Sequence, residues 1–345
     1  MRRMPASLAL VLAAALSADA PAQQTEAKRA GSGDPLVTNL TIFAGGPSGL
    51  WRSPDWGSTW KKVEKKVEKG ADPAAIGSVR AILPVGPAVY VAGSGGVLVS
   101  DDFGESWTRW PLEASVLSIL PSRYPLSDLT VFVGVSDGLL VSPDAGRTFQ
   151  PAGLRGVAVN RIEWPGPALV VGTSAGVVVS HDMGLTWDAP GEGLPASDVG
   201  ALALSSYFAS DPVLFAGVGE HGVYRSRDGG KTWTPSGLQG SRVVDLVWLG
   251  PFLYALTDGG LFRSQDVGDT WGTIGRGLLG TPRRILFPLA PASGAEVFLA
   301  TDRGIWRSGD GAESFLQVGL VDETVSVLAT FPQAAPLSTK DKKKK

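Results

Sequence analysis

Short apolar segments recur along most of the chain and are separated by glycine-rich or polar turns. In each unit a segment such as AVYVAG from Ala88 precedes a segment of the form Gly-apolar-x-x-Ser, such as GVLVS from Gly96. Apolar runs of about four to eight residues that are rich in Val and bounded by turn residues are typical of β-strands. The pattern therefore predicts an all-β chain.

A polar turn of constant form, Ser-x-Asp-x-Gly-x-(Ser/Thr)-(Trp/Phe), follows each Gly-apolar-x-x-Ser segment. Its seven copies begin at Ser53, Ser100, Ser142, Ser180, Ser226, Ser264 and Ser308. Consecutive copies are 38 to 47 residues apart, and one four-stranded propeller blade takes about 40 to 50 residues. Seven units at this spacing predict a seven-bladed β-propeller with four-stranded antiparallel blades.

The two ends of the repeat region complement each other. An apolar pair such as Val79 and Ile82 follows each copy of the turn and marks the innermost strand of the next blade. No such strand precedes the first blade, because residues 23–35 are polar and glycine-rich, whereas the chain ends with an extra apolar segment from Thr324 to Phe331. We expect that segment to lie beside Leu40–Ala44 as the innermost strand of the first blade, which closes the ring.

The residue types in the turn have structural explanations. Asp can accept hydrogen bonds from backbone N–H groups of the turn, and Gly allows a positive φ. The aromatic residue recurs at the same place in every unit, so we interpret it as a packing residue and not as a platform for sugars. The last copy has Ala312 in place of Gly, and Phe149 and Phe315 replace Trp in two copies, which predicts looser turns in those blades. The seven aspartates are Asp55, Asp102, Asp144, Asp182, Asp228, Asp266 and Asp310.

Composition excludes several kinds of function. The chain has no Cys and only two His, which excludes a disulfide framework, a thiolate zinc site and a His-rich metal site. We expect no cofactor. The formal net charge is −2 and the pI is about 5.8, so the chain lacks the basic character of most nucleic-acid-binding domains.

The N-terminal segment has the order of a secretory signal peptide. Arg2 and Arg3 precede an apolar run from Leu8 to Leu16 and the small residues Ala20-Pro21-Ala22. That run is shorter than the ~18 residues that an uncleaved membrane anchor would need. We therefore expect cleavage near Ala22 and export to the periplasm or the outside of the cell.

The remaining chain divides into three parts. Residues 23–35 are expected to be a disordered linker, residues 36–332 the propeller, and residues 333–345 a disordered Lys-rich tail. Residues 23–339 contain 24 basic and 31 acidic residues, a net charge of −7. We expect the mature protein to be a monomer.

Charged residues fall in or near the predicted innermost strands, where they should ring the axial channel. In a propeller with this strand order, the loops that usually bind ligands lie on the face opposite the Asp-containing turns. These loops join the second strand of a blade to the third, and the same face holds the starts of the innermost strands. The candidate channel residues are Arg80, Arg161, Glu163, Asp245, Arg283 and Arg284.

A second set of arginines stands directly before the Ser of the turn. Four blades have Arg at this position and the other three have Val99, Val141 and Val179. The Arg blades are consecutive once the ring closes. Either each Arg packs on a neighbouring blade and pairs with a carboxylate, or the arc presents a row of guanidinium groups to an acidic protein partner. The four residues are Arg52, Arg225, Arg263 and Arg307.

The repeated turn resembles the Asp-box, or bacterial neuraminidase repeat. The form apolar-x-Arg-Ser-x-Asp-x-Gly-x-Thr-Trp, seen in YRSRDGGKTW from Tyr224 and FRSQDVGDTW from Phe262, is similar to the repeats of photosystem II stability and assembly factors. More distantly the chain resembles sialidases and sortilin-type propellers. The first resemblance implies a non-catalytic scaffold that binds a protein partner in the cell envelope.

Two other functions stay open at this point. The first is an exo-acting glycoside hydrolase of the sialidase type. The resemblance to sialidases implies an arginine triad, a Tyr activated by Glu and an Asp acid/base, but the Phe/Tyr-Arg-Ile-Pro segment typical of sialidases is missing. A retaining glycosidase with paired carboxylates would instead use Glu163, Glu220 and Asp245 from neighbouring blades. A carbohydrate-binding module would need exposed aromatic residues beyond those of the repeat. The candidates are Trp110, Trp164 and Trp248, of which the last two are expected to pack between blades.

Overall fold

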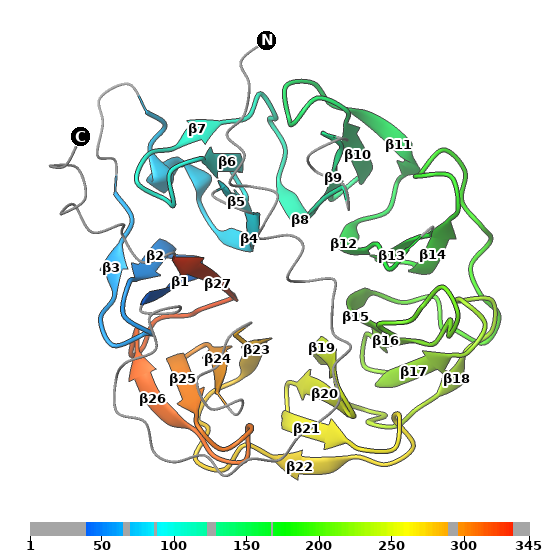
Figure 1. The fold of residues 1–345 in the computed structure, drawn as a ribbon. Coiled ribbons are helices and arrows are strands. Elements are labelled where there is room, and N and C mark those ends of the chain that lie inside the picture. The colour runs from blue at the N-terminus through cyan, green and yellow to red at the C-terminus, as the bar shows by residue number, and fades with distance from the viewer. Residues whose placement is uncertain are drawn as a thin grey trace, which may run out of the picture.

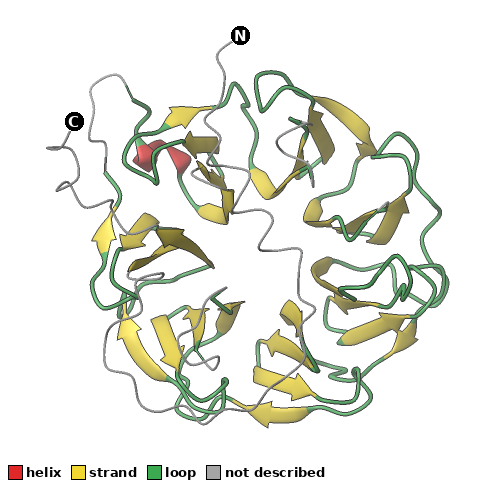
Figure 2. Cartoon of the chain, in the orientation of Figure 1, coloured by secondary structure: helices red, strands yellow, loops and turns green. Residues whose placement is uncertain are grey.

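A computed structural model describes residues 39–64, 70–85, 88–122, 129–166, 168–288 and 296–333. Seven antiparallel sheets stand around a central axis as the blades of a propeller (Figure 1). Strands account for nearly all the regular structure, and the described part has one short 3-10 helix, η2 (Pro73–Ile76) (Figure 2). The all-β, seven-bladed fold predicted from the repeat is confirmed.

In every blade the first-named strand lies nearest the axis and the others follow outward. Blade 1 contains β27 (Val327–Gln333), β1 (Asn39–Gly46), β2 (Gly49–Ser53) and β3 (Lys61–Lys62). Blade 2 contains β4 (Val79–Val85), β5 (Ala88–Gly93), β6 (Gly96–Ser100) and β7 (Thr108–Arg109). Blade 3 contains β8 (Val116–Pro121), β9 (Val131–Val135), β10 (Gly138–Ser142) and β11 (Gln150–Arg155). Blade 4 contains β12 (Val159–Glu163), β13 (Leu169–Thr173) and β14 (Gly176–Ser180).

The remaining three blades follow the same order. Blade 5 contains β15 (Val199–Leu204), β16 (Leu214–Val218), β17 (Val223–Ser226) and β18 (Thr234–Pro235). Blade 6 contains β19 (Val243–Leu249), β20 (Phe252–Thr257), β21 (Gly260–Ser264) and β22 (Gly272–Ile274). Blade 7 contains β23 (Pro282–Leu286), β24 (Val297–Thr301), β25 (Gly304–Ser308) and β26 (Leu316–Gly319).

The last strand of the chain closes the ring. β27 pairs antiparallel with β1, with Ala329 opposite Phe43 and Val327 opposite Gly45, and the two strands lie side by side in Figure 1. The N–H of Ser326 also donates to the Gly45 carbonyl at 2.7 Å. The predicted pairing of the two ends is therefore confirmed.

Blade 4 is an exception to the expected four strands. Its sheet has three strands among the described residues. Where the other blades have a fourth strand, blade 4 has a single backbone hydrogen bond, from the Asp188 N–H to the Val179 carbonyl at 2.8 Å. The segment that follows Trp187 contains Pro190, Gly191 and Gly193. The chain then runs to the next blade, where the Glu192 N–H donates to the Lys231 carbonyl and the Glu192 carbonyl accepts the Trp233 N–H, both at 2.8 Å.

Adjacent blades meet through the aromatic residue of the repeated turn. The indole Nε1 of Trp271 donates to the Ser236 carbonyl of the preceding blade at 2.6 Å, and Trp187 donates in the same way to Ala152 at 3.0 Å. The contact requires Gly in the preceding blade, because a Cβ on Gly237 would lie 2.6 Å from the Trp271 ring. The repeated aromatic residue thus packs one blade against the next.

The predicted parts outside the propeller, residues 1–22, 23–35 and 334–345, lie outside the described residues. A charged segment, KKVEKKVEKGADPAA from Lys61, follows the first repeat. It begins as β3 and ends in η2, and residues 65–69 between them are not described. Within the part of the chain that the structure describes, no helix is long and apolar enough to cross a membrane.

Candidate functional site

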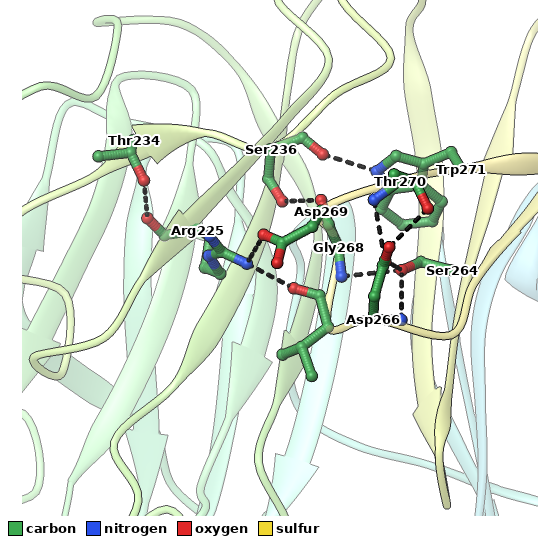
Figure 3. A network of polar contacts seen from close by, with 10 residues as sticks. Arg225, Thr234, Ser236, Ser264, Asp266, Gly268, Asp269, Thr270 and Trp271 are labelled. Atoms are coloured by element: carbon green, nitrogen blue, oxygen red, sulfur yellow. Dashed lines mark hydrogen bonds and ion pairs between the residues drawn. The ribbon is translucent and has the colours of Figure 1, made fainter.

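The repeated turn is held by the same hydrogen bonds in all seven blades. In the sixth copy the Ser264 hydroxyl donates to Asp266 Oδ1 at 2.7 Å and accepts the Gly268 N–H at 2.8 Å. Thr270 donates its N–H to Oδ1 at 2.8 Å and its hydroxyl to Oδ2 at 2.5 Å (Figure 3). Each box carboxylate is thus satisfied within its own turn, which gives it a structural role.

The last copy keeps this geometry without its Gly. The six glycines have φ between 81° and 98°, and Ala312 takes a φ of 73°. The Ala312 N–H still donates to the Ser308 hydroxyl at 2.9 Å, and Ser314 still donates twice to Asp310. The expected loosening of this turn is therefore wrong, because the hydrogen bonds hold Ala in a conformation that it otherwise avoids.

Hydrogen bonding makes the box aspartates stronger acids. The Thr270 hydroxyl, then the Thr270 N–H and the Ser264 hydroxyl, stabilise the carboxylate and lower the pKa of Asp266 to about 2. The pKa of each of the other six box aspartates is also lowered. All seven turns therefore depend on an ionised carboxylate.

The four arginines that precede the box Ser are each paired within the molecule. Arg225 contacts Asp269 of the next blade at 2.6 Å and also donates to the Val267 carbonyl at 2.7 Å (Figure 3). Arg263 pairs with Glu313 of the next blade at 2.7 Å, Arg52 pairs with Glu105 of the next blade, and Arg307 pairs with Glu296 of its own blade. The arc does not present a row of free guanidinium groups, so the geometry supports the packing interpretation.

The pairing rule is visible in the sequence once neighbouring units are aligned. Where a blade has Arg before its box Ser, the residue after the box Gly in the next unit is acidic in three of four cases, namely Glu105, Asp269 and Glu313. Where a blade has Val, the corresponding residues are Arg147, Leu185 and Lys231. The exception, Arg307, faces Ser58 in the first unit and uses Glu296 instead. The pairing cannot be seen within a single repeat, because it joins residues of two neighbouring units.

The axial channel holds a polar cavity of about 360 Å³ that is lined from all seven blades. Six innermost strands carry a β-bulge at their second residue, and all six bulged residues line the cavity. A bulge redirects a side chain relative to a regular strand, and in three of the six strands the redirected residue, Arg80, Asn160 or Arg283, is polar. The bulged residues are Arg80, Leu117, Asn160, Gly200, Val244 and Arg283.

Of the six predicted channel residues, five line this cavity. The sixth, Asp245, is 2% exposed and lies behind it, where it accepts hydrogen bonds from Arg284 Nη1 and the Ile285 N–H, both at 3.2 Å. Arg161 donates to Glu163 at 2.8 Å. Burial lowers the pKa of Arg161, but Glu163 and Asp245 outweigh burial and hold this pKa above its usual value.

Two channel arginines are exposed where the innermost strands begin. Because the strands of a blade are antiparallel, these starts lie on the same side as the turns between second and third strands, which we call the loop face. The repeated turns lie on the opposite side, the Asp-box face. Arg80 donates to the Ser115 hydroxyl at 2.9 Å, and Arg283 has no hydrogen bond or ion pair within the described residues. The cationic part of the channel therefore opens on the loop face.

The three carboxylates considered for glycoside hydrolysis do not form a free pair. Glu163 is paired with Arg161, and Asp245 is buried against Arg284. Glu220 is exposed between β16 and β17 and is not among the residues that line the axial cavity. Most retaining glycosidases use two carboxyl groups roughly 5 Å apart, and here two of the three carboxylates are already engaged by arginines.

The three non-repeat tryptophans differ in their surroundings. Trp110 is 9% exposed and lies between the rings of Tyr90 and Phe149, with both centroid distances 5.5 Å. Trp164 and Trp248 are half-buried and line a second cavity together. Among the described residues, no group of three or more His, Asp or Glu could hold a metal ion.

Comparisons with known proteins agree with the fold. Residues 224–235 match the BNR/Asp-box repeat, and no curated protein matches the sequence significantly. A solved structure described as "YCF48 bound to D1 peptide" is 15% identical, with a TM-score of 0.54 over 71% of this chain and 82% of that one. YCF48 from Cyanidioschyzon merolae is 13% identical, with a TM-score of 0.53 over 76% of this chain and 92% of that one.

An ancestral GH74 enzyme is also similar, with 20% identity and a TM-score of 0.57 over 79% of this chain. The match covers only 40% of that enzyme. At these identities the likenesses establish the fold and not the activity. The chain is a seven-bladed β-propeller built from Asp-box repeats.

Proposed function

We propose that this protein is an exported, non-catalytic scaffold that binds a protein partner through its loop face. The observation that carries the proposal is the charge of the axial channel. Four arginines accompany two carboxylates there, in a propeller whose body has a net charge of −7. A local cationic site attracts an acidic segment of a partner, whereas the acidic surface around the site would repel that segment.

Two arginines are best placed to meet such a segment. Arg80 and Arg283 are exposed on blades 2 and 7, which flank blade 1, and Arg283 has no ionic partner within the described residues. Guanidinium groups bind carboxylates in a bidentate manner, which favours Asp, Glu or a chain terminus. The likeness to YCF48, solved with a D1 peptide, supports peptide binding as a use of this fold.

Export and catalysis are separate parts of the proposal. The N-terminal order of Arg2-Arg3, apolar run and small residues supports secretion with cleavage near Ala22. The alternative, an exo-acting glycoside hydrolase of the sialidase type, is less consistent with a sequence that lacks the Phe/Tyr-Arg-Ile-Pro segment. A retaining glycosidase is less consistent with carboxylates that are already paired to Arg161 and Arg284. Fluorogenic sialosides and glycosides test it directly, and turnover by the purified protein would overturn the non-catalytic proposal.

Binding is tested with fluorescently labelled peptides that differ only in acidic content. We expect an acidic peptide to bind the mature protein, and the double variant Arg80→Gln/Arg283→Gln to bind it at least about tenfold more weakly at low salt, where screening is least. Arg227→Gln, an exposed arginine of the Asp-box face, is the matched control. Equal affinities for acidic and neutral peptides, or an unaffected double variant, would contradict the proposal.

A further inference from the structure

Two tryptophans that the repeat does not use lie on either side of one groove. Trp164 and Trp248 each stand five residues after the first residue of their innermost strands, β12 and β19. Blade 5, which lies between them, has Leu204 at the same register. All three residues line a cavity of about 370 Å³. The groove opens toward the Asp-box face, because it is formed where these innermost strands end.

Both indoles are held in place by buried aromatic neighbours. Trp164 meets the ring of Phe132 edge to face at a centroid distance of 5.8 Å, and Trp248 meets Phe215 at 5.4 Å. Each tryptophan is only half-buried by these contacts. Aromatic surface that is already fixed costs little conformational entropy when a ligand covers it.

The inner end of the groove is polar but electrically balanced. Arg161 and Glu163 line it, and the contact between them joins one nitrogen to one oxygen, Nε to Oε1, at 2.8 Å. Within the described residues the terminal amino groups of Arg161 and Glu163 Oε2 make no other hydrogen bond. Ser205 and the exposed Ser206 complete the polar lining. The groove therefore offers donors and acceptors without a net charge.

We infer that this groove binds a neutral carbohydrate, with a pyranose ring between Trp164 and Trp248. Pyranosides combine apolar C–H faces with hydroxyl groups, which match two indoles and a balanced Arg–Glu pair. A net-neutral lining does not favour a carboxylate or phosphate ligand. The volume lies near the lower end of the roughly 300 to 1,000 Å³ typical of small-molecule sites, which suits one or two sugar rings. The groove shares Arg161 and Glu163 with the axial cavity, but it opens on the Asp-box face, whereas the partner-binding test concerns Arg80 and Arg283 on the loop face.

The test uses saturation-transfer NMR and calorimetry with cellotriose, chitotriose and xylotriose, and with sialyllactose as a charged comparison. We expect at least one neutral trisaccharide to bind with an affinity that does not change between low and high salt. Trp164→Leu and Trp248→Leu should each weaken binding about tenfold, because a central aromatic anchor carries much of the binding energy. Leu already occupies this register in blade 5, so both variants should fold.

Phe287→Leu is the matched control. Phe287 stands at the same register of blade 7, packs on Tyr254 at a centroid distance of 4.8 Å and does not line the groove. The Phe287→Leu variant should bind the neutral trisaccharide as tightly as the parent does. Both Trp variants should still bind the acidic peptide at the loop face. Failure of all neutral probes to bind, or binding that survives in both Trp variants, would overturn the inference. Preferential, salt-sensitive binding of sialyllactose would also overturn it.

Discussion

Arg225 Nη1 of blade 5 lies 2.6 Å from Asp269 Oδ1 of blade 6 (Figure 3). The Arg225 side chain is 15% exposed and Asp269 is 59% exposed, so the pair lies at the surface end of the interface between two blades. Blades 1 and 6 are joined to their successors in the same way. Blades 2 to 4 replace this pair with Val before the box Ser and a non-acidic residue in the next unit. Six of the seven interfaces thus fall into two types, and the seventh, between blades 7 and 1, has no such pair because Arg307 contacts Glu296 of its own blade.

The two types of interface predict a compensating pair of substitutions. Asp269→Lys should lower the free energy of unfolding by about 1 kcal/mol, because it places a second cation beside a mostly buried Arg225 and removes its partner. Adding Arg225→Val recreates the Val179 and Lys231 combination of blades 4 and 5 and should recover most of the loss. Urea denaturation of both single variants and the double variant measures the coupling. Strictly additive effects would show that the pair contributes nothing.

A second prediction concerns the close approach of Trp271 to blade 5. Gly237→Ala places a Cβ 2.6 Å from the Trp271 ring at a φ of 105°, so we expect a loss of about 2 to 3 kcal/mol from overpacking and backbone strain. Gly240→Ala is the matched control, because Gly240 also has a positive φ, 77°, but no atom lies within 4 Å of its Cβ position. The control should lose only about 1 kcal/mol. Thermal melts of the two variants measure the loss of stability in each. Equal losses would show that the close contact with the Trp271 ring contributes nothing.

The box carboxylates predict sensitivity to acid. Their pKa values are lower in the folded protein than the usual 3.8, and that of Asp266 is about 2, so the unfolded chain binds more protons in this range. Stability from these groups is complete above about pH 4 and is lost as the pH falls toward 2. The free energy of unfolding should therefore decrease across that window, and Asp266→Asn should show a smaller decrease because one titrating group is gone. A pH-independent stability between 4 and 2 would contradict this account.

The repeat predicts the fold well because the residues within each unit determine the strands and the turn of that unit. The segment GLWRS from Gly49 and its equivalents coincide with observed strands such as β2, and the spacing of the boxes gives the number of blades. The prediction of four strands fails in blade 4, where the chain after Trp187 is bonded to blade 5 through Glu192 instead of pairing further with β14. The local pattern of a unit predicts where its strands lie, but it does not show whether the outermost strand pairs with its neighbour.

The candidate sites were harder to predict because they depend on contacts between units. The positions of Arg80, Arg161 and Arg283 along the innermost strands were enough to predict that these residues line the channel. Asp245 lies behind the cavity, where Arg284 and the Ile285 N–H of the next blade hold its carboxylate, and the sequence does not signal this contact between units. The shared groove of Trp164 and Trp248 likewise depends on Leu204 of the blade between them.

The final prediction concerns the closure of the ring. A chain that ends after Glu323 lacks β27, and with it Leu328 and Phe331, which are each 3% exposed. Phe331 also meets the Phe103 ring of blade 2 at a centroid distance of 4.9 Å. Losing a buried Leu or Phe side chain costs about 2 to 5 kcal/mol each, and the loss also exposes the paired edge of β1. Since most domains are stable by only about 5 to 15 kcal/mol, we expect this truncation to abolish cooperative unfolding. A chain that ends after Gln333 keeps every strand of the described residues and should melt like the parent, so near-ultraviolet circular dichroism of the two truncations isolates the contribution of β27. Cooperative melting of the shorter chain at the parent's temperature would mean that the closing strand does not hold the ring together.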